Sequence, residues 1–360
     1  MIIMYIGEKE GYGVNVGSKT IYCYHGHPYY VPNGIKSTIE KNDDFVIIKD
    51  KKDVPNMTVP HEKNPKYLIY PPAQEYNLIM FLPILTYWQD CNFTADIDIV
   101  CPIEKRDIFY GYNVNIIDQE KANLNGKQHY TDIYDFRKYT PTQLQQRVMH
   151  LIEFYLGLMQ LDKKDMVEKG YLKPVINQPE KNDNGKFVIG VACKGALPMK
   201  TWDRSLDRVT EILNRLDNNN YEIWFFDELL NIDKERILMP KLPLYQQVKN
   251  IAQCDMIITF GDHNLTYYGG ALGINTITFL GPLTQELSIG CFDTVKGFEV
   301  ALDCRPCIFT KPMKACEAAM PCFNDIGINT VIDAINDQIK SVMGTNKNIN
   351  RTVDDDRPRK

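Results

Sequence analysis

The sequence lacks a hydrophobic run long enough to cross a membrane. No apolar stretch approaches the ~20 residues of a membrane-spanning helix. The N-terminal segment Met1–Met4 is apolar, but it is short and has none of the basic residues that begin a signal peptide. The sequence therefore predicts a cytoplasmic protein without a transmembrane segment.

The sequence also lacks an excess of positive charge. Its formal net charge is −5, from 41 Lys and Arg against 46 Asp and Glu. A protein that holds nucleic acid through a broad surface needs a basic face, so this balance argues against that class, although a local basic patch remains compatible with it. The length of 360 residues suffices for two full domains with a substantial core.

One stretch, residues 238–282, predicts much of the organisation of the chain. Apolar residues at helical spacing over 244–252 predict a helix, and the β-branched run over 256–259 predicts a buried parallel strand. A helix followed directly by a strand of this kind is typical of a doubly wound α/β domain. In such domains ligands bind beyond the carboxyl ends of the strands.

The second part of this stretch repeats the pattern. Turn and N-cap residues over Gly261–Asn264 lead into a predicted helix over 265–272, and Gly273 closes that helix. Residues 274–280 then predict another apolar strand. The first turn of the second helix has unpaired backbone N–H groups, which suit an anion such as a diphosphate.

The motif around this helix resembles the donor-side signature of the lipopolysaccharide heptosyltransferases, glycosyltransferase family 9. The family pattern is Asp-Ser/Thr-Gly, two residues, His, a small-residue helix ending Ala-Leu-Gly, and a strand ending Gly-Pro-Thr. The chain has Asp262, Ala271-Leu272-Gly273 and Gly281-Pro282-Leu283-Thr284 at matching places. It has His263 for the hydroxyl residue, Asn264 for the glycine and Tyr267 for the histidine. The resemblance implies that Asp262, His263, Asn264 and Tyr267 contact the donor, and the replacements leave the particular sugar open.

The resemblance implies a GT-B-like α/β fold, in which two doubly wound Rossmann-type domains face each other across a cleft. We expect an acceptor-side domain over 56–180 and a donor-binding domain with a cysteine cluster over 181–343. Residues 1–55 show short alternating segments between turn residues, which predict a small β-rich module. The polar, charged residues 344–360 predict a disordered tail.

The acceptor-side domain contains the predicted catalytic residues. Residues 66–77 read as a strand and a loop, and they precede a helix over 78–88 and a strand over 97–101. The family places an aspartate six residues before a helix proline, and counting back from Pro83 puts Asn77 there. An amide cannot accept a proton as a general base, so Glu75 on the same loop is the candidate base. An equally open interpretation is that Glu75 is a solvated acid or a helix N-terminal charge.

Two further elements are predicted in this domain. Residues 108–114 predict a short strand, and residues 142–161 predict an amphipathic helix entered through a proline near its start. The polar residues 178–185 break the pattern and predict the linker between the two domains.

The donor-binding domain begins with a predicted buried strand over 186–192 and a helix over 206–216. Between them, Lys200 and Trp202 match the family's basic-x-Trp entry to the helix, where the basic residue meets the donor phosphates. A lysine supplies a mobile point charge for a diphosphate, although it could also be a solvent-exposed loop residue. Lys194 is a second, weaker candidate for this contact.

The next predicted strand, over 221–226, ends in two acids. An acidic residue at a strand end can accept hydrogen bonds from ribose hydroxyls, which makes Asp227 or Glu228 a candidate, and the sequence does not choose between them. Lys241 and Leu242 match the family loop that holds the nucleotide base, mostly through main-chain atoms.

Ten cysteines are many for a cytoplasmic protein, and four of them are clustered. Cys304 and Cys307 form a Cys-x2-Cys pair, and Cys316 and Cys322 follow within range of a tetrahedral zinc site. Disulfides and unlinked thiols remain alternatives. A terminal amphipathic helix over 331–343 follows the cluster.

The sequence as a whole predicts an inverting glycosyltransferase that moves a sugar from a nucleotide-diphosphate-sugar donor to an acceptor hydroxyl. It predicts no catalytic cofactor and no metal at the reaction centre. The acceptor, whether a glycan, another polymer or a modified nucleobase, is not identified, and neither are the donor sugar and the oligomeric state. The replaced motif residues leave two alternatives: a catalytically idle relative that serves in binding or assembly, or a phage-encoded transferase acting on modified DNA bases in the host cytoplasm.

Overall fold

The computed structural model describes most of the chain. The description omits residues 1, 7–10, 17–18, 25–27, 31–35, 49–64, 92–94, 126–128, 140–148, 160, 162, 169, 178–180, 182–184, 196–201, 203–205, 218–220, 308–319 and 356–360.

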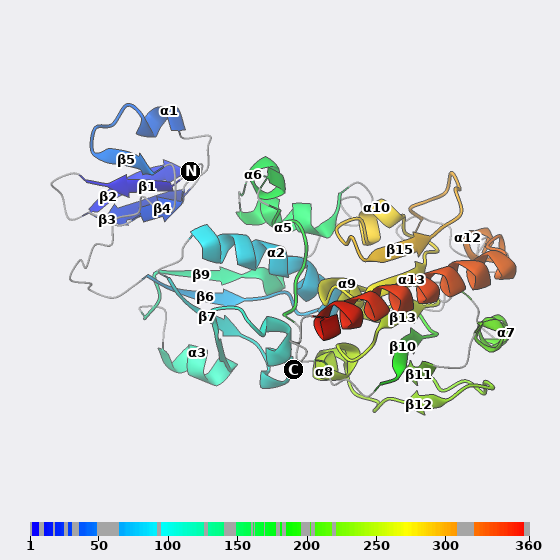
Figure 1. Ribbon diagram of the computed structural model, residues 1–360. Coiled ribbons are helices and arrows are strands. Elements are labelled where there is room, and N and C mark those ends of the chain that lie inside the picture. Colours follow the sequence, from blue (N-terminus) through cyan, green and yellow to red (C-terminus); the bar gives the residue numbers. More distant parts are fainter. Residues whose placement is uncertain are drawn as a thin grey trace.

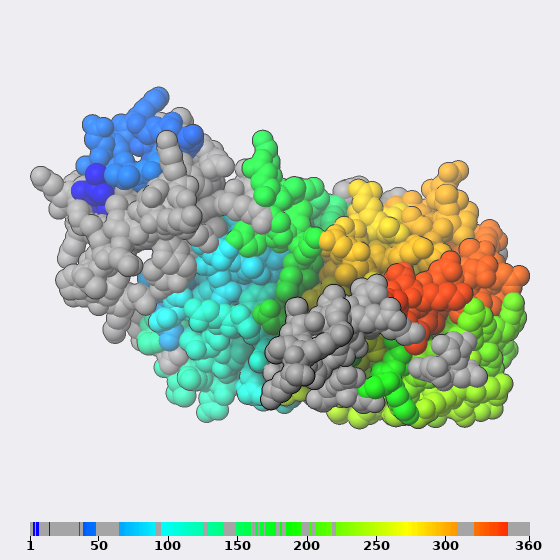
Figure 2. Space-filling model, viewed as in Figure 1, coloured from blue at the N-terminus to red at the C-terminus, as the bar shows by residue number. Residues whose placement is uncertain are grey.

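Short antiparallel strands form the N-terminal part of the structure. β1 (Ile2–Tyr5) pairs with β4 (Pro28–Tyr30) and β5 (Phe45–Ile48), while β2 (Gly11–Val16) and β3 (Lys19–Tyr24) form a separate hairpin. A single turn of helix, α1 (Lys36–Ile39), precedes β5. These strands lie beside the first α/β unit (Figure 1), and the described N-terminal residues drawn in blue lie at the end of the molecule away from the orange-red last helix (Figure 2). Whether residues 1–55 fold as an independent module stays a prediction.

The first parallel sheet is built from four strands in the order β8-β7-β6-β9. They are β6 (Lys66–Tyr70), β7 (Asp96–Val100), β8 (Asn115–Ile117) and β9 (Asp132–Asp135). Helix α2 (Glu75–Cys91) covers one face, and α3 (Gln119–Asn125) lies on the other (Figure 1). The apolar side chains of β6 and β7 alternate between these two faces, so both helices gain a buried contact surface.

Two predictions for this unit need correction. The strand expected over 108–114 is instead the end of a 3₁₀ helix, η3 (Ile103–Phe109), and the turn that follows it. Its adjacent residues Ile108 and Phe109 are both buried, a pattern that a strand with alternating faces does not produce. The predicted helix over 142–161 is observed as α5 (Leu151–Met159). Residues 142–148 lie outside the described residues, whereas Met149 and His150 are described and are not helical, so the helix expected there is wrong at these two positions.

The remaining elements of this half are short. They are η5 (Phe136–Lys138) and α6 (Lys163–Glu168).

The second parallel sheet has six strands in the order β12-β11-β10-β13-β14-β15. They are β10 (Phe187–Ala192), β11 (Tyr221–Phe225), β12 (Arg236–Leu238), β13 (Met256–Thr259), β14 (Asn275–Phe279) and β15 (Val295–Phe298). Every residue of β10 and β13 is buried, as expected for central strands covered on both faces. The predicted strand and helix order of residues 238–282 is confirmed.

Helices pack on both faces of this sheet (Figure 1). They are α7 (Asp207–Arg215), η7 (Leu244–Gln246), α8 (Val248–Ile251), α9 (Asn264–Ala271), α10 (Gln285–Ser288), α12 (Pro321–Asn324) and α13 (Ile328–Asp355). Gly269 lets α9 lie close to the sheet, because a Cβ at this position would come within 2.4 Å of the Thr276 Oγ1 atom. Gly273 ends the α9 turn with φ +70°, the conformation expected of a C′ glycine.

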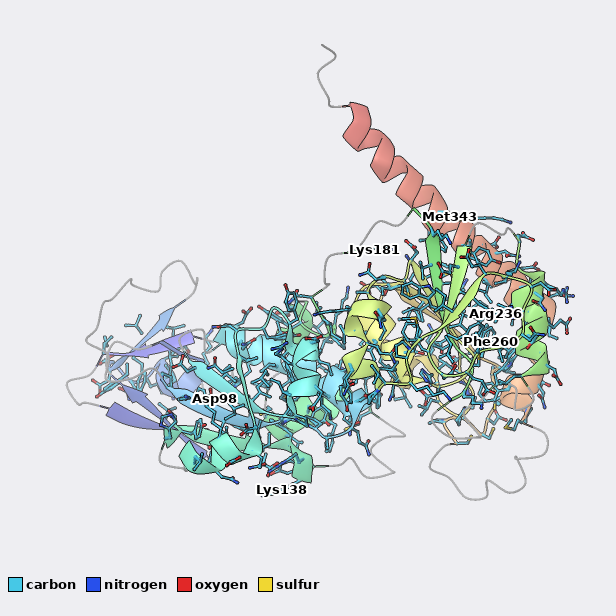
Figure 3. The ribbon with its side chains drawn as sticks, turned by 90° about the horizontal axis from the view of Figure 1, so that it is seen from below. Asp98, Lys138, Lys181, Arg236, Phe260 and Met343 are labelled. Carbon is cyan, nitrogen blue, oxygen red and sulfur yellow. The ribbon has the colours of Figure 1, made fainter. Side chains whose placement is uncertain are left out.

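Helix α13 is longer than the sequence predicts. It continues to Asp355, and its C-terminal part runs out from the body beyond Met343 (Figure 3). The disordered tail expected over 344–360 stays a prediction. Among the described residues, no helix is both long and apolar enough to cross a membrane.

Each sheet reverses its strand order at one place, and the two reversals bring the loops with the candidate residues together. In the first sheet the reversal lies between β6 and β9, and β6 leads into α2. In the second sheet it lies between β10 and β13, and β13 leads into α9. A crevice at the carboxyl ends of strands forms at such a switch point, and α2 packs against α9. The two-sheet arrangement fits a GT-B-like fold.

Candidate functional site

The structure brings Glu75 and Asn264 together from the two α/β units. The Asn264 side-chain Nδ2 donates a hydrogen bond to Oε2 of Glu75 at 3.2 Å, across 189 positions of sequence. Glu75 is the first residue of α2 and Asn264 the first residue of α9, so two helix N-termini meet here. The sequence placed Glu75 on a loop, and this prediction was wrong, because the helix starts three residues earlier than the apolar pattern indicated.

Two opposing effects act on the pKa of Glu75. Burial raises the pKa of the Glu75 carboxyl above its ordinary value, and three contacts work against this: the Asn264 amide, the backbone N–H of Tyr245, and the charge of Lys105. Lys105 is a residue of η3, and its Nζ donates a 2.9 Å hydrogen bond to the carbonyl oxygen of Ala73, just before α2. A carboxylate whose pKa is raised is a better proton acceptor than a solvated one.

Asn77 lies in the same helical turn but does not share this environment. Residues two apart on an α-helix point about 200° away from each other, so Asn77 faces away from the side that meets α9. Its side chain makes no hydrogen bond to the described residues. Of the two predicted catalytic residues, only Glu75 forms a hydrogen bond with the second α/β unit among the described residues.

A buried hydrogen-bond network lies directly behind Asn264. The Tyr267 hydroxyl donates to Oδ1 of Asp262 at 2.7 Å and lies 2.9 Å from the Ser288 hydroxyl. The rings of Tyr76 and Tyr267 are 4.4 Å apart, which joins α2 to α9 a second time. Burial, reinforced by Asp262, raises the pKa of Tyr267 well above its usual range. The tyrosine is therefore a fixed hydrogen-bond donor that orients Asp262.

His263 acts as the N-cap of α9. Its Nδ1 accepts a hydrogen bond from the backbone N–H of Leu265 at 3.0 Å, and its carbonyl oxygen accepts from Thr266 N–H at 3.0 Å. Burial lowers the pKa of His263, although Asp227 and Asp262 oppose the shift. A neutral ring with Nδ1 accepting carries its proton on Nε2, which remains a donor.

The capping corrects one expectation about the first turn of α9. Two of its N–H groups already have acceptors within the protein, so they are not available to an anion in this state. The donors left at this helix start include the His263 Nε2–H.

Asp227 and Glu228 serve the loop after β10. One carboxylate oxygen of Asp227 accepts the backbone N–H groups of Cys193 at 2.8 Å and Lys194 at 2.7 Å. The Lys194 side chain forms an ion pair with Glu228. These contacts hold together two loops that meet at the switch point. They also use carboxylate oxygens of Asp227 and Glu228 that were predicted to accept hydrogen bonds from the ribose hydroxyls.

Three predicted donor-side residues remain, of which the structure describes Lys241 and Leu242 but not Lys200. Lys200 lies outside the described residues, whereas its neighbour Trp202 is fully buried, stacked on Phe260 and Phe279, with its indole N–H donating to the Phe323 carbonyl at 3.0 Å. Lys241 and Leu242 are exposed in the loop after β12. The Leu242 carbonyl accepts from the Gln247 side chain at 2.7 Å, which uses one of its two lone pairs.

The cysteines do not form a metal centre among the described residues. Cys304 is exposed, Cys307 is half-buried, and Cys322 is buried in the core beside α13. None of the three is in a disulfide, and the described residues hold no group of three or more His, Cys, Asp or Glu suited to a metal. Cys316 lies outside the described residues, so a four-thiol zinc site stays a prediction.

Sequence reasoning missed several residues of this site. Tyr76, Ser288, Tyr245 and Lys105 all contact the predicted residues, yet they come from four separate elements. Lys105 and Tyr245 belong to 3₁₀ turns, which have weak sequence signals. Tyr76, next to Glu75, could have been found by asking which aromatic residue adjoins the candidate base.

Comparisons with known proteins bear on the fold. No family model matches the sequence, and no curated protein matches it. Solved structures do match. A glycosyl transferase family 9 protein from Veillonella parvula has 16% identity and a TM-score of 0.56, over 76% of this chain and 97% of its own.

Two further structures come from Escherichia coli. ADP-heptose lipopolysaccharide heptosyltransferase II has 17% identity and a TM-score of 0.55, over 78% of this chain and 99% of its own. The dodecameric iron-containing heptosyltransferase TibC, solved with ADP-D-β-D-heptose, has 12% identity and a TM-score of 0.57, over 89% and 86%. The resemblance to glycosyltransferase family 9 that the sequence indicates is therefore confirmed at the level of the fold.

Proposed function

We propose that this protein is a glycosyltransferase that moves a sugar from a nucleotide-diphosphate donor to an acceptor hydroxyl, with inversion at the anomeric carbon. The observation that carries the proposal is the contact of Glu75 with Asn264. It sets a half-buried carboxylate of the first α/β unit against the helix start that follows β13 in the second. General support comes from the fold, which is that of nucleotide-sugar transferases.

The proposed reaction divides its tasks between the two units. The acceptor hydroxyl lies against Glu75, whose carboxylate takes the hydroxyl proton as the oxygen attacks the anomeric carbon. A new C–O bond forms there while the bond to the diphosphate oxygen breaks, and the nucleoside diphosphate leaves with the bonding electrons. Attack from the side opposite the leaving group inverts the configuration.

The leaving diphosphate needs positive charge and hydrogen-bond donors. On the second unit these are the His263 Nε2–H and the predicted charge of Lys200. Asp262 is held by Tyr267, so its carboxylate is fixed for a donor hydroxyl. No step of this scheme uses a metal ion, and the roles of these residues are part of the proposal.

The donor of the proposed reaction is a nucleotide-diphosphate sugar. TibC was solved with ADP-D-β-D-heptose, which makes ADP-heptose the first donor to test. TibC is also described as iron-containing, so any metal analysis of this protein should cover iron as well as zinc. The replaced motif residues His263, Asn264 and Tyr267 are the reason to test other sugars beside heptose.

A second candidate function is supported by Asn77. The amide stands where the family has its aspartate, so an idle relative that binds a nucleotide sugar without transferring it is consistent with the sequence. The experiment that separates the two is a thermal-shift screen of nucleotide sugars, followed by measurement of nucleoside diphosphate release with candidate acceptors. A donor that raises the melting temperature but releases no diphosphate with any acceptor supports the idle relative. A screen with no stabilising nucleotide sugar contradicts both functions.

A further inference from the structure

A cavity of about 870 Å³ lies in the first α/β unit, apart from the site described above. It is lined by the edge strand β8, by η3 and the turn after it, by Lys121 of α3, by Lys66 at the start of β6 and by Asp98 in the middle of β7. Neither Glu75 nor any predicted donor-side residue lines it. Figure 3 shows Asp98 of its wall among the strands of the first sheet, well away from Phe260 in the second.

A buried carboxylate organises one wall of this cavity. Asp98 is 2% exposed, and both of its oxygens have partners. Oδ1 accepts from the Asn115 side-chain Nδ2 at 3.2 Å, and Oδ2 accepts from the Tyr130 hydroxyl at 3.0 Å and from Lys66 Nζ at 3.1 Å. Burying a carboxylate is costly unless it is paired in this way, so the ion pair fixes Lys66 in one position.

Lys66 keeps donor capacity after this pairing. Its ammonium group also lies 3.3 Å from the Nε2 atom of His129, another residue of the cavity wall. An ammonium group has three N–H donors, and these two contacts use two of them. The Lys66 side chain is 27% exposed, so the third donor can be directed into the cavity.

The lining carries more positive than negative charge. Lys66, Arg106 and Lys121 stand against Asp98 and Asp107, three cations against two acids. Asp98 is neutralised inside the wall, and the Arg106–Asp107 pair is loose, with 3.9 Å between its charged atoms. The Lys121 side chain has no ion-pair partner within the part of the chain that the structure describes. A ligand that neutralises the excess positive charge of the lining must carry negative charge.

Apolar and aromatic side chains supply the other part of a binding site. Ile103 and Tyr110, at the two ends of η3, are 60% and 61% exposed and both line the cavity. Ligand sites in proteins combine such an apolar wall with a few fixed polar groups, and their volumes are typically ~300–1,000 Å³. The cavity has both features and a volume within that range.

We infer that this cavity is a second binding site, for a small organic molecule that carries a phosphate or carboxylate group. Lys66, Arg106 and Lys121 bind the anionic group, and Ile103 and Tyr110 pack against the organic part. The site lies beside η3, the element that places Lys105 next to Glu75, but it shares no residue with the proposed reaction centre. The inference therefore holds whether or not the protein transfers a sugar.

Titration calorimetry on the full chain, without any nucleotide sugar, tests the inference. The probes are glucose 1-phosphate, glucuronate and glucose, each up to about 10 mM, a range that detects millimolar affinity. We expect heat from the phosphate or the carboxylate probe and none from glucose. Whichever anion binds more tightly identifies the source of the charge, and binding should weaken as salt is raised.

Hydrogen exchange locates the bound probe. Protection is expected in peptides covering residues 103–121 and not in peptides covering the start of α9 at Asn264. Heat accompanied by protection only at α9 would mean that the anion occupies the donor region, and the inference would be wrong. Equal binding of glucose, or no heat from any of the three probes, would also overturn it.

Charge-removing variants complete the test. Arg106→Gln and Lys121→Gln change exposed side chains, and each should weaken binding of the anion about tenfold, the effect of losing one charged contact. Lys164→Gln, on the exposed face of α6, is the matched control and should leave the affinity unchanged. Lys66→Met alone could unfold the protein by stranding Asp98, so it is paired with Asp98→Asn. A folded double variant that still binds normally would contradict the role of Lys66.

Discussion

Glu75 and Asn264, the first residues of two helices in different α/β units, are joined by a 3.2 Å hydrogen bond. The bond links the candidate base of one sheet to the helix that follows the central switch strand of the other. A pair in this position can both join the units and set the proton affinity of the carboxylate. The predictions below separate these two roles.

The first prediction concerns proton transfer. Glu75→Gln keeps an oxygen that can accept from Asn264 but cannot take a proton, so turnover should fall ~10²–10⁴-fold. Donor binding, measured by calorimetry, should stay within about twofold of the parent value because the helix start is preserved. The matched control is Glu104→Gln, an exposed acid on η3, which should keep full turnover.

If Glu75→Gln retained full activity, the base would lie elsewhere. Three other acids of the first unit would then be candidates. Asp135 ends β9 at the switch point, whereas Asp132 begins that strand and Asp90 lies near the far end of α2. Asp135 would be tested next, although its hydrogen bond with Arg137 holds its pKa below the usual value and makes it a weaker base.

A second prediction follows from the pKa of Glu75. The Asn264 amide lowers that pKa against the effect of burial, so Asn264→Leu should raise it further. A general base works only when deprotonated, and the acid limb of the pH–turnover profile should therefore move to higher pH. Asn264→Asp adds a like charge and should move the limb further in the same direction. An acid limb that stays in place in both variants would show that Glu75 does not set it.

A third prediction tests the donor phosphates. Lys200→Ala should weaken nucleoside diphosphate binding by ~1–3 kcal/mol, the scale of a charge-assisted hydrogen bond. Calorimetry with the nucleoside diphosphate provides the measurement, and Lys249→Ala, an exposed lysine on α8, provides the control. Equal affinity in both variants would remove Lys200 from the site.

A fourth prediction concerns stability at low pH. His150 caps α5 through its Nδ1, which accepts from the Ile152 N–H at 3.2 Å, and its Nε2 has no partner among the described residues. Burial lowers the pKa of His150 to about 4. Because the unfolded chain binds a proton near pH 6.5, the contribution of the neutral ring is full above that pH and is lost as the pH falls toward 4.

A shift from 6.5 to about 4 corresponds to a change of about 3 kcal/mol in the free energy of unfolding. His150→Asn keeps a side chain that can cap the helix but does not titrate, so its denaturation midpoint should fall less between pH 6.5 and 4 than that of the parent. Urea denaturation at several pH values measures this difference. Parallel pH curves for the two proteins would exclude His150 as a contributor.

A fifth prediction concerns the cysteine cluster. Zinc should copurify at about one ion per chain and should be lost in a Cys304→Ser/Cys307→Ser variant, because thiolates hold structural zinc. The three described thiols do not form a site alone, so Cys316 must contribute. Elemental analysis without metal, together with mass spectrometry showing oxidised pairs, would favour disulfides.

The sequence predicted the interior of the fold better than its edges. Every residue of β10 and β13 is buried and these strands are mostly apolar, and Gly273 marks a helix end by its conformation. The edge strands β12 and β15 have three and four residues and partly exposed side chains, so they leave no run or alternation to detect. The 3₁₀ element η3 was missed because its residues likewise form neither an apolar run nor an alternating pattern.

The candidate site shows a different limit. The motif placed Asp262, His263 and Asn264 in one turn, which local spacing is able to predict. The partner of Asn264 is 189 residues away, and the start of α2 at Glu75 coincides with that contact rather than with a strong capping residue. Where a tertiary contact of this kind coincides with a helix end, the local sequence pattern does not predict the position of that end.

The strand order of the two sheets has a consequence for biosynthesis. In each sheet the first strand made, β6 or β10, is central, and the next two are added successively on one side before the chain returns to the other. As the polypeptide leaves the ribosome, every new strand therefore meets an open edge, and none has to insert between two that are already paired. Because domains made first also fold first, the sheet that carries Glu75 can be complete before β10 is translated.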